Sequence, residues 1–326
     1  MILQKFNLKK QYALHHSSSA KIWGILILLL VPVIAITPEF IYPANLANVM
    51  LQMAPLGIIA VGQTFVIISG NIDMSVGNQI SLISLIASSL MSDNPWNILC
   101  VTLFCLIVGM CCGFLNGFLL KLFSIPPLVA TLCTGYFFQG IAFALHTTSG
   151  GYIPQKFKAL LTTSWGIIST PFLLFVLVFI VAWYLLSQTP YGKHLYALGG
   201  NPEVLHNSGI SPNKIKIKTY MLSGFLCAVV GIYLAARLRS GSSHYGDSYT
   251  LLSITATVVG GTSMAGGTGY LSGTFAGTIL VSMLTNVLNN IAFKYNLQSS
   301  YYKDIITGII LISAMFFYRK KEQPHE

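Results

Sequence analysis

Long apolar runs separated by short polar segments dominate the sequence. A transmembrane helix needs about 17 to 25 apolar residues to cross roughly 30 Å of hydrocarbon, and ten stretches fit this pattern, several of them short or interrupted. They cover residues 20–37, 49–69, 77–92, 96–120, 126–145, 170–188, 217–238, 250–264, 270–291 and 303–318. The pattern predicts an all-α, polytopic membrane protein with about ten transmembrane helices.

Small polar residues break the apolar pattern at two places, near residues 70–77 (GNIDMSVG) and near residues 260–269 (GGTSMAGGTG). Non-helical backbone at membrane depth is tolerated only where protein buries it or where it lines a water-filled cavity. We therefore expect broken or re-entrant segments at both places. A tight turn or re-entrant hairpin is favoured over a phosphate loop at the second break, because the lysine of such a loop is absent.

The first break carries a carboxylate, Asp73, between Asn71 and Ser75. An ionised Asp at the centre of a lipid-facing helix costs on the order of 3 kcal/mol, so this side chain is expected to face protein or water. Two roles remain open. Asp73 caps the following helix, whose dipole a carboxylate complements, or it lines a translocation pathway while Asn71 and Ser75 cap freed amides.

The composition excludes a soluble enzyme, because 54% of residues are hydrophobic and only 8% are charged, whereas a soluble domain has about a quarter charged residues. The formal charge of +10 does not indicate a nucleic-acid partner, since the charges lie at the ends of apolar runs without a basic stripe. Twelve of the 18 basic residues fall on one side if both termini are cytoplasmic, which is the predicted orientation. The connecting segments are too short for a second domain, so residues 1–326 are predicted to form one transmembrane domain.

Glycines spaced by four residues occur twice inside predicted spans. The two rows are Gly109, Gly113 and Gly117, and Gly269, Gly273 and Gly277. Such rows let helix backbones approach closely in lipid. Tight helix packing is favoured over a chance pattern in a chain with 29 glycines.

A short, self-contained helix is predicted within the cytoplasmic loop of about residues 189–216. Its signals are an N-cap, a first-turn proline, an acidic residue that complements the dipole and a terminal glycine: Asn201, Pro202, Glu203 and Gly209. The expected helix exposes Val204 and Leu205. It either lies on the membrane surface or docks into a cytoplasmic partner.

Enzyme and metal motifs are missing from the sequence. The six cysteines and seven histidines are scattered, without the spacing of a metal site, an HExxH motif or a phosphate-binding loop, so we predict no catalytic residue and no cofactor on this chain. The spans do contain polar residues, namely Gln63, Thr64, Asn116, Gln139, Asn286, Asn289 and Asn290, with Tyr136 and Phe137 nearby. They either face a pathway or form interhelical hydrogen bonds, worth about 0.6 kcal/mol each.

Four ordered segments carry a family resemblance that extends from about Asn45 to Arg319. They are residues 57–77 (GIIAVGQTFVIISGNIDMSVG), 191–210 (YGKHLYALGGNPEVLHNSGI), 260–269 (GGTSMAGGTG) and 300–308 (SYYKDIITG). The chain resembles the permease subunits of ribose-type ABC importers, which serve monosaccharides and autoinducer-2.

The resemblance implies a multi-pass protein of the bacterial cell membrane that pairs with a second copy or a sister permease. It also implies a cytoplasmic ATPase subunit that binds ATP and Mg, and a periplasmic or lipid-anchored substrate-binding protein. The coupling helix of the family falls on residues 201–209 and supports partner docking there. Three departures leave the sugar open: Val204-Leu205 replaces Ala-Ala, Asn71 replaces Gly, and an acidic pair is replaced by Thr250 and Leu252.

The sequence therefore predicts a permease that forms a pathway for ribose or a related sugar-like solute. The translocation candidates are Gln63, Thr64, Asn71, Asp73, Ser75, Asn286 and Asn289, and the ATPase-coupling candidates are Asn201, Glu203, Val204, Leu205 and Gly209. The alternative is an ion-coupled secondary transporter of a small polar solute, in which Asp73 binds a proton or cation. An intramembrane enzyme is disfavoured, because paired carboxylates or a nucleophile with a base are not visible.

Overall fold

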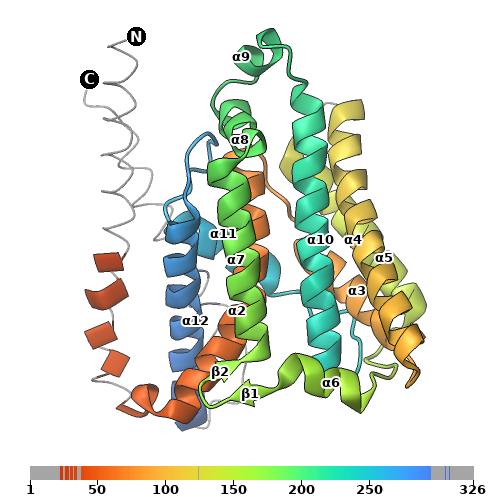
Figure 1. Cartoon of the computed structure of the whole chain (residues 1–326), viewed down its shortest axis with the longest axis vertical. Helices are drawn as coiled ribbons and strands as arrows, with labels where there is room; N and C mark the ends of the chain where they lie inside the picture. Colours follow the sequence, from red (N-terminus) through yellow and green to blue (C-terminus); the bar gives the residue numbers. More distant parts are fainter. Residues whose placement is uncertain are drawn as a thin grey trace.

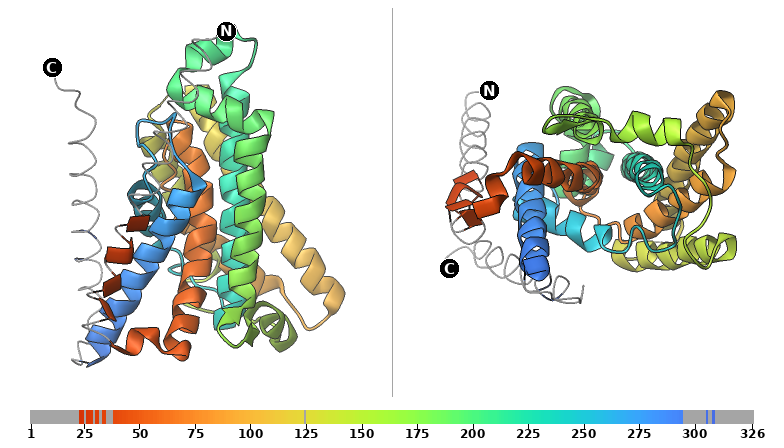
Figure 2. Two further views of the ribbon diagram at one scale, coloured as in Figure 1. Left: turned by 60° about the vertical axis from the view of Figure 1, so that its left-hand side comes forward. Right: turned by 90° about the horizontal axis from the view of Figure 1, so that it is seen from below.

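The computed structural model describes residues 38–123 and 125–294, with isolated residues and short runs between 23 and 34 and at 305 and 308 (Figures 1 and 2). Half of the first predicted span and nearly all of the last lie outside the described residues, and each of the other eight coincides with a helix. The helices are η1 (Pro38–Ile41), α2 (Pro43–Ile68), α3 (Val76–Leu90), α4 (Pro95–Phe123), α5 (Pro127–Leu145), α6 (Gln155–Thr162), α7 (Thr170–Gln188), α8 (Pro190–Gly200), α9 (Pro202–Asn207), α10 (Pro212–Leu238), α11 (Tyr249–Val259) and α12 (Leu271–Lys294).

Six of these helices are long and apolar enough to cross a membrane: α2, α4, α5, α7, α10 and α12. Helices α3 and α11 are apolar but shorter. Sheet is confined, in the described part of the chain, to an antiparallel hairpin of two-residue strands, β1 (Ser164–Trp165) and β2 (Ile168–Ser169), and one isolated bridge. The fold is therefore that of an all-α polytopic membrane protein, as the apolar pattern predicts.

Helix α10 occupies the middle of the bundle and packs against α4, α3 and α2, whereas α11 packs against α12 and α2. The bundle has two distinct ends (Figure 1). Helices α8 and α9 lie at one end, which we call the α9 end, and α6 and the β1–β2 hairpin lie at the opposite end, which we call the hairpin end. Helix α2 is buried along most of its length, so the apolar core surrounds it.

The two predicted breaks lie where the chain leaves α2 and α11. Residues 69–75 separate α2 from α3, and residues 260–270 separate α11 from α12. The second break bonds the end of α2, because the amide of Gly267 donates to the carbonyl of Ile68 (2.8 Å), and it contacts the first break, because Gly266 lies against Gly70. Gly266 and Gly267 hold positive φ angles of 87° and 71°, which side chains with a Cβ rarely adopt. The second break is thus a turn between two packed helices, with glycines where the backbone requires them.

The glycine row of α4 lies against the backbone of α10. A Cβ atom at Gly113 would overlap the carbonyl oxygen of Tyr220, and one at Gly117 would lie 2.7 Å from the Cα atom of Ile217. Gly109 meets the carbonyl of Gly224 in the same way. Only residues without a Cβ permit the two helices to approach this closely. The close approach stabilises the pair through van der Waals contacts and weak Cα–H···O bonds, because the hydrophobic effect does not drive helices together in lipid.

The second glycine row brings α12 against α11 and the end of α2. Cβ atoms at Gly273 and Gly277 would overlap the carbonyl oxygens of Gly260 and Ala256. Gly269 precedes α12 and packs against Thr262, where a Cβ would lie 2.6 Å from a methyl carbon. Both rows therefore occur at helix contacts in the described bundle.

We predict that Gly113→Ala destabilises the protein, because the added methyl group must displace the α10 backbone. Overpacking of this kind costs about 1–3 kcal/mol. The matched control is Gly140→Ala in α5, where nothing lies within 4 Å of the added Cβ and helix propensity favours Ala by up to about 1 kcal/mol. The measurement is the thermal unfolding midpoint in detergent, and equal midpoints for the two variants would contradict the packing described here.

Candidate functional site: the buried break and the α9 helix

The Asp73 carboxylate lies in the interior, with 0% of the residue exposed, and three donors bind it. Its Oδ1 accepts hydrogen bonds from the amide of Ser75 (3.0 Å) and from Ser75 Oγ (2.6 Å). Its Oδ2 accepts from Ser223 Oγ of α10 (3.1 Å). Asp73 thus satisfies an amide at the start of α3 and ties this helix to α10. This bond differs from the predicted helix cap, because Ser75 is itself the residue before α3 and the first-turn amide of Gly77 donates to Thr250 Oγ1 (2.9 Å) instead.

A polar network continues from Asp73 into two further helices. Ser75 Oγ accepts from Gln79 Nε2 (2.7 Å) and from Asn116 Nδ2 of α4 (2.8 Å). Asn116 Oδ1 in turn accepts from Thr134 Oγ1 of α5 (2.5 Å). These residues are 4% exposed or less. Buried polar groups are costly unless they are paired, so this chain of bonds is the condition under which a polar break is stable inside the bundle.

The remaining translocation candidates occupy three separate places. Gln63 joins the break, because its Nε2 donates to the Asp73 carbonyl (3.4 Å). Asn71 is buried beside it and donates to the carbonyl of Ser69 (2.9 Å). Thr64 instead bonds Thr274 of α12 (2.7 Å between the hydroxyl oxygens).

Asn286 and Asn289 lie on α12, away from the break. Asn286 exchanges amide hydrogen bonds with Asn45 of α2 (3.0 and 3.1 Å), which is the interhelical role. Asn289 is partly buried, and its Oδ1 has no hydrogen-bond partner among the described residues. The structure therefore unites Gln63, Asn71, Asp73 and Ser75 but separates Thr64, Asn286 and Asn289 from them.

Sequence analysis missed part of the network. Ser223, Gln79 and Thr134 each complete a hydrogen bond to it, yet each is a single small or polar residue inside an apolar run. Gln79 lies one helical turn after Ser75, and Thr134 lies one turn after Thr131. A stripe of polar residues spaced by three or four positions could therefore have indicated both. Ser223 carried no such signal, because only the approach of α10 brings it to Asp73.

Helix α9 begins at the predicted cap. The side-chain oxygen of Asn201 accepts from the amides of Glu203 (2.9 Å) and Val204 (3.3 Å), and Pro202 is the first helical residue. The helix ends before Gly209, whose φ of 79° is the left-handed conformation typical of a helix stop. These features agree with the local signals in the sequence.

The expectation that α9 exposes both Val204 and Leu205 is wrong for Leu205. Val204 is 58% exposed, but Leu205 is only 3% exposed and packs in the main core cluster with Leu198 and Ile215. Consecutive helical residues point about 100° apart, so a helix lying on the bundle buries one and presents the other. Leu205 therefore holds α9 to the bundle, and Val204 belongs to its free surface.

Helix α8 connects α9 to both breaks. Tyr196 Oη donates to the carbonyl of Gly269 (2.7 Å), next to the start of α12. Gly199 lies directly against the carbonyl of Ile68 at the end of α2 and against Gly267 of the second break. The short α8–α9 unit thus contacts the points where α2 and α12 meet their non-helical segments, which the sequence did not indicate.

Among the described residues, no group of three or more His, Cys, Asp or Glu side chains is placed to hold a metal ion. Helices that cross a membrane, two short helices attached to polar breaks and a capped helix at one end are the features of a multi-pass transport permease. The chain belongs to the family described as "Branched-chain amino acid transport system / permease component", whose model matches residues 45–315.

Several curated proteins are similar along nearly the whole chain. The ribose import permease protein RbsC of Haemophilus influenzae is 37% identical over 89% of this chain and 90% of its own length. RbsC of Bacillus subtilis is 35% identical over 91% of each chain, and the L-arabinose transport system permease protein AraH of Escherichia coli is 30% identical over 94% of each. These relatives confirm the resemblance to ribose-type permeases. No solved structure gives a significant match.

We predict that Asn201→Ala loosens α9, because two amides lose their acceptor at a cost of about 1 kcal/mol. Amide exchange at residues 203–207 should become roughly fivefold faster by hydrogen–deuterium exchange of the purified permease. The matched control is Ser211→Ala, since Ser211 occupies the cap position of α10 without a side-chain capping bond. The capping role of Asn201 would be contradicted if Ser211→Ala accelerated exchange at the start of α10 more than Asn201→Ala accelerated it at α9.

Proposed function

We propose that this chain is the permease subunit of an ATP-driven ABC importer in a bacterial cell membrane and forms the pathway for ribose or a related monosaccharide. The similarity to ribose import permeases over about nine-tenths of the chain carries this proposal. The polar break buried in an apolar bundle supports it, because a transport protein needs polar groups at membrane depth. The chain itself is not an enzyme in this proposal.

The α9 end is proposed to face the cytoplasm. Lys121, Lys193, Lys214, Lys216 and Lys218 lie near it, whereas Lys156, Lys158, Arg237 and Arg239 lie at the hairpin end. The orientation therefore rests on the whole sequence, in which 12 of the 18 basic residues fall on the side of the α9 end when both termini are placed there. Residues 1–326 then form a single ten-span permease domain with both termini inside and a coupling loop of about residues 189–216. A second permease copy or sister permease completes the pathway.

The other partners follow from this orientation. A cytoplasmic ATPase subunit binds at α9 and carries the ATP and Mg sites, and a periplasmic or lipid-anchored binding protein delivers the sugar at the hairpin end. Val204 supplies an exposed apolar contact for the ATPase. Glu203 contributes a negative charge in the first turn of α9, and Gly209 ends the helix. Membrane lipid surrounds the remaining apolar faces.

The contacts of α8 explain how an ATPase could move the pathway. Leu205 fixes α9 to the core, so a displacement of α9 is passed to α8 as a unit. Tyr196 and Gly199 then pass it to the breaks beside α2 and α12. Alternating access requires only that the ATPase binds one arrangement of these elements better than the other. In this proposal, α3 changes its orientation about its first turn, where the Asp73 network holds it.

The direct test is uptake of radiolabelled ribose into proteoliposomes that contain the permease, its ATPase and its binding protein. Uptake should require internal ATP and continue when proton and sodium gradients are collapsed. Uptake driven by an ion gradient without ATP would instead support the secondary transporter. Arabinose and other monosaccharides, supplied as unlabelled competitors, would identify the preferred sugar.

We predict that Val204→Asp weakens ATPase binding or uncouples hydrolysis from transport. A carboxylate in a desolvated contact costs several kcal/mol, whereas on a solvated surface it changes stability by no more than about 0.5 kcal/mol. Copurification of the ATPase and sugar-stimulated hydrolysis are the measurements. Leu160→Asp is the matched control, because Leu160 is 67% exposed on α6 at the hairpin end. Equal ATPase copurification in the two variants would argue against α9 as the coupling surface.

We predict that Asp73→Asn retains substantial ATP-driven uptake. Asn keeps an oxygen that accepts from the Ser75 amide, and a neutral sugar needs no ion-coupling carboxylate. Asp73→Leu is the comparison variant: it removes both acceptors inside the bundle and should lower stability by about 1–3 kcal/mol for each donor left unpaired. Complete loss of uptake in well-folded Asp73→Asn, combined with ATP-independent uptake by the wild type, would favour ion coupling.

A further inference from the structure

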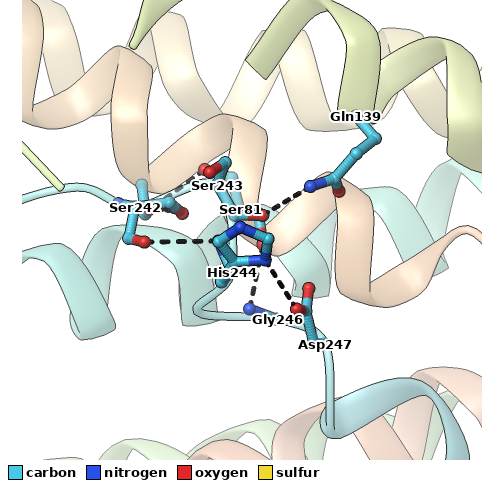
Figure 3. Close-up of polar contacts among 8 residues, drawn as sticks. Ser81, Gln139, Ser242, Ser243, His244, Gly246 and Asp247 are labelled. Carbon is cyan, nitrogen blue, oxygen red and sulfur yellow. Dashed lines mark hydrogen bonds and ion pairs between the residues drawn. The ribbon is translucent and has the colours of Figure 1, made fainter. Parts of the chain in front are cut away.

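The segment between α10 and α11, residues 239–248, turns back into the bundle along α3 (Figure 3). Ser84 Oγ donates to the Ser242 carbonyl (3.2 Å), and the amide of Gly246 donates to Ser81 Oγ (2.9 Å). Because the residue numbers rise in this segment while they fall along α3, the two run antiparallel. The segment therefore leads inward from the hairpin end.

The contacts at its two ends measure how deep the segment reaches. Gly241 packs against Ser88 near the end of α3, and Gly246 lies directly against the carbonyl of Gly77 at the start of α3. The eleven helical steps from Gly77 to Ser88 correspond to about 16 Å at 1.5 Å per step. This distance is about half of the roughly 30 Å hydrocarbon thickness.

An ionisable pair lies on this segment. His244 Nδ1 and Asp247 Oδ2 are 2.8 Å apart, and the two side chains are 61% and 55% exposed. The ring of Phe143 from α5 contacts His244 edge-on, with 5.7 Å between centroids. Ionisable side chains at membrane depth face the interior of a bundle or a water-filled cavity rather than lipid. The open face of this pair therefore points to water.

Helix α5 fixes the segment and adds an aromatic side chain. Gln139 Nε2 donates to the carbonyl of Ser243 (2.7 Å), next to His244 (Figure 3). Tyr136, one helical turn earlier on α5, is 73% exposed. A carboxylate, an imidazole and an exposed aromatic ring on neighbouring elements suit a neutral sugar: its hydroxyls donate to the carboxylate, and its C–H faces contact the ring.

We propose that His244 and Asp247 form a subsite for the hydroxyl groups of a neutral sugar in the extracytoplasmic half of the translocation pathway. Gln139 is a positioning residue that holds the segment against α5. The proposal rests on the function proposed above, since it requires a sugar pathway and places the hairpin end outside. The two Asp247 oxygens accept from neighbouring sugar hydroxyls, and the imidazole offers one donor or acceptor.

The first measurement is the accessibility of the pair to water. After the six native cysteines are replaced, His244→Cys and Asp247→Cys are treated with a charged, membrane-impermeant methanethiosulfonate reagent from the hairpin side of the reconstituted importer. Both should react, as should Lys158→Cys on α6. Ile180→Cys, in the apolar middle of α7 and 55% exposed, is the unreactive control. Failure of both pair variants to react while Lys158→Cys reacts would overturn the proposal.

The second measurement is the ATP-driven uptake of radiolabelled ribose. Asp247→Asn should lower the maximal uptake rate about tenfold, the effect of one lost hydrogen bond to a charged group. The half-saturating sugar concentration should not change, because the binding protein sets it. Asp247→Glu, which keeps the carboxylate, should recover most of the rate, and equal ATPase copurification will show that the variants are folded.

The outcomes separate this inference from the function on which it rests. A wild type that takes up no sugar with ATP overturns the proposed function, and the subsite with it. A wild type that transports sugar, beside an Asp247→Asn variant that transports it equally well, overturns the subsite alone. A wild type and variants that transport only with an ion gradient would assign the pair to ion coupling and also overturn the subsite.

Discussion

Backbone that is not helical must not face hydrocarbon, and the arrangement of this protein follows from where it places two such segments. Both breaks pack against the bundle helices, and they contact each other where Gly266 lies against Gly70. Each break shortens a neighbouring helix, so α3 and α11 remain too short to span a membrane alone. The longer helices around them shield these irregular segments from lipid.

The Asp73 network shows how the cost of this arrangement is met. A buried carboxylate with three donors, one of them on another helix, is stable only while α3 and α10 remain in register. Gly231 of α10 permits the close approach to α3, because a Cβ there would lie 2.8 Å from the carbonyl oxygen of Ile80. The α4 glycines hold α4 against α10 near Tyr220 and Gly224. The hydrogen bonds of the buried Asp73 network therefore depend on the close packing of these helices.

The same packing limits how motion can enter the bundle. Leu205 fixes α9 to the core, and α8 lies against both breaks, so the coupling proposed above has a continuous path of contacts from α9 to the breaks. The segment that carries His244 and Asp247 also contacts α3, because the amide of Gly246 donates to Ser81 Oγ. A short helix held by contacts of this kind at both ends suits a change between two arrangements, because packed interiors are bistable rather than continuously deformable.

Much of this description was predictable from sequence, because it depends on local rules. The apolar runs place eight described helices, the cap at Asn201 and the stop at Gly209 bound α9, and the glycine rows identify the tight helix contacts. Each of these signals acts over a few residues, through helix rise, capping geometry or the absence of a Cβ. Tertiary structure alone decided which helices meet. Ser223 reaches Asp73 from 150 positions away in the chain, Leu205 is buried although Val204 is exposed, and residues 239–248 fold inward beside α3. No local pattern encodes these contacts, because they arise only when the faces of several helices are packed together at once.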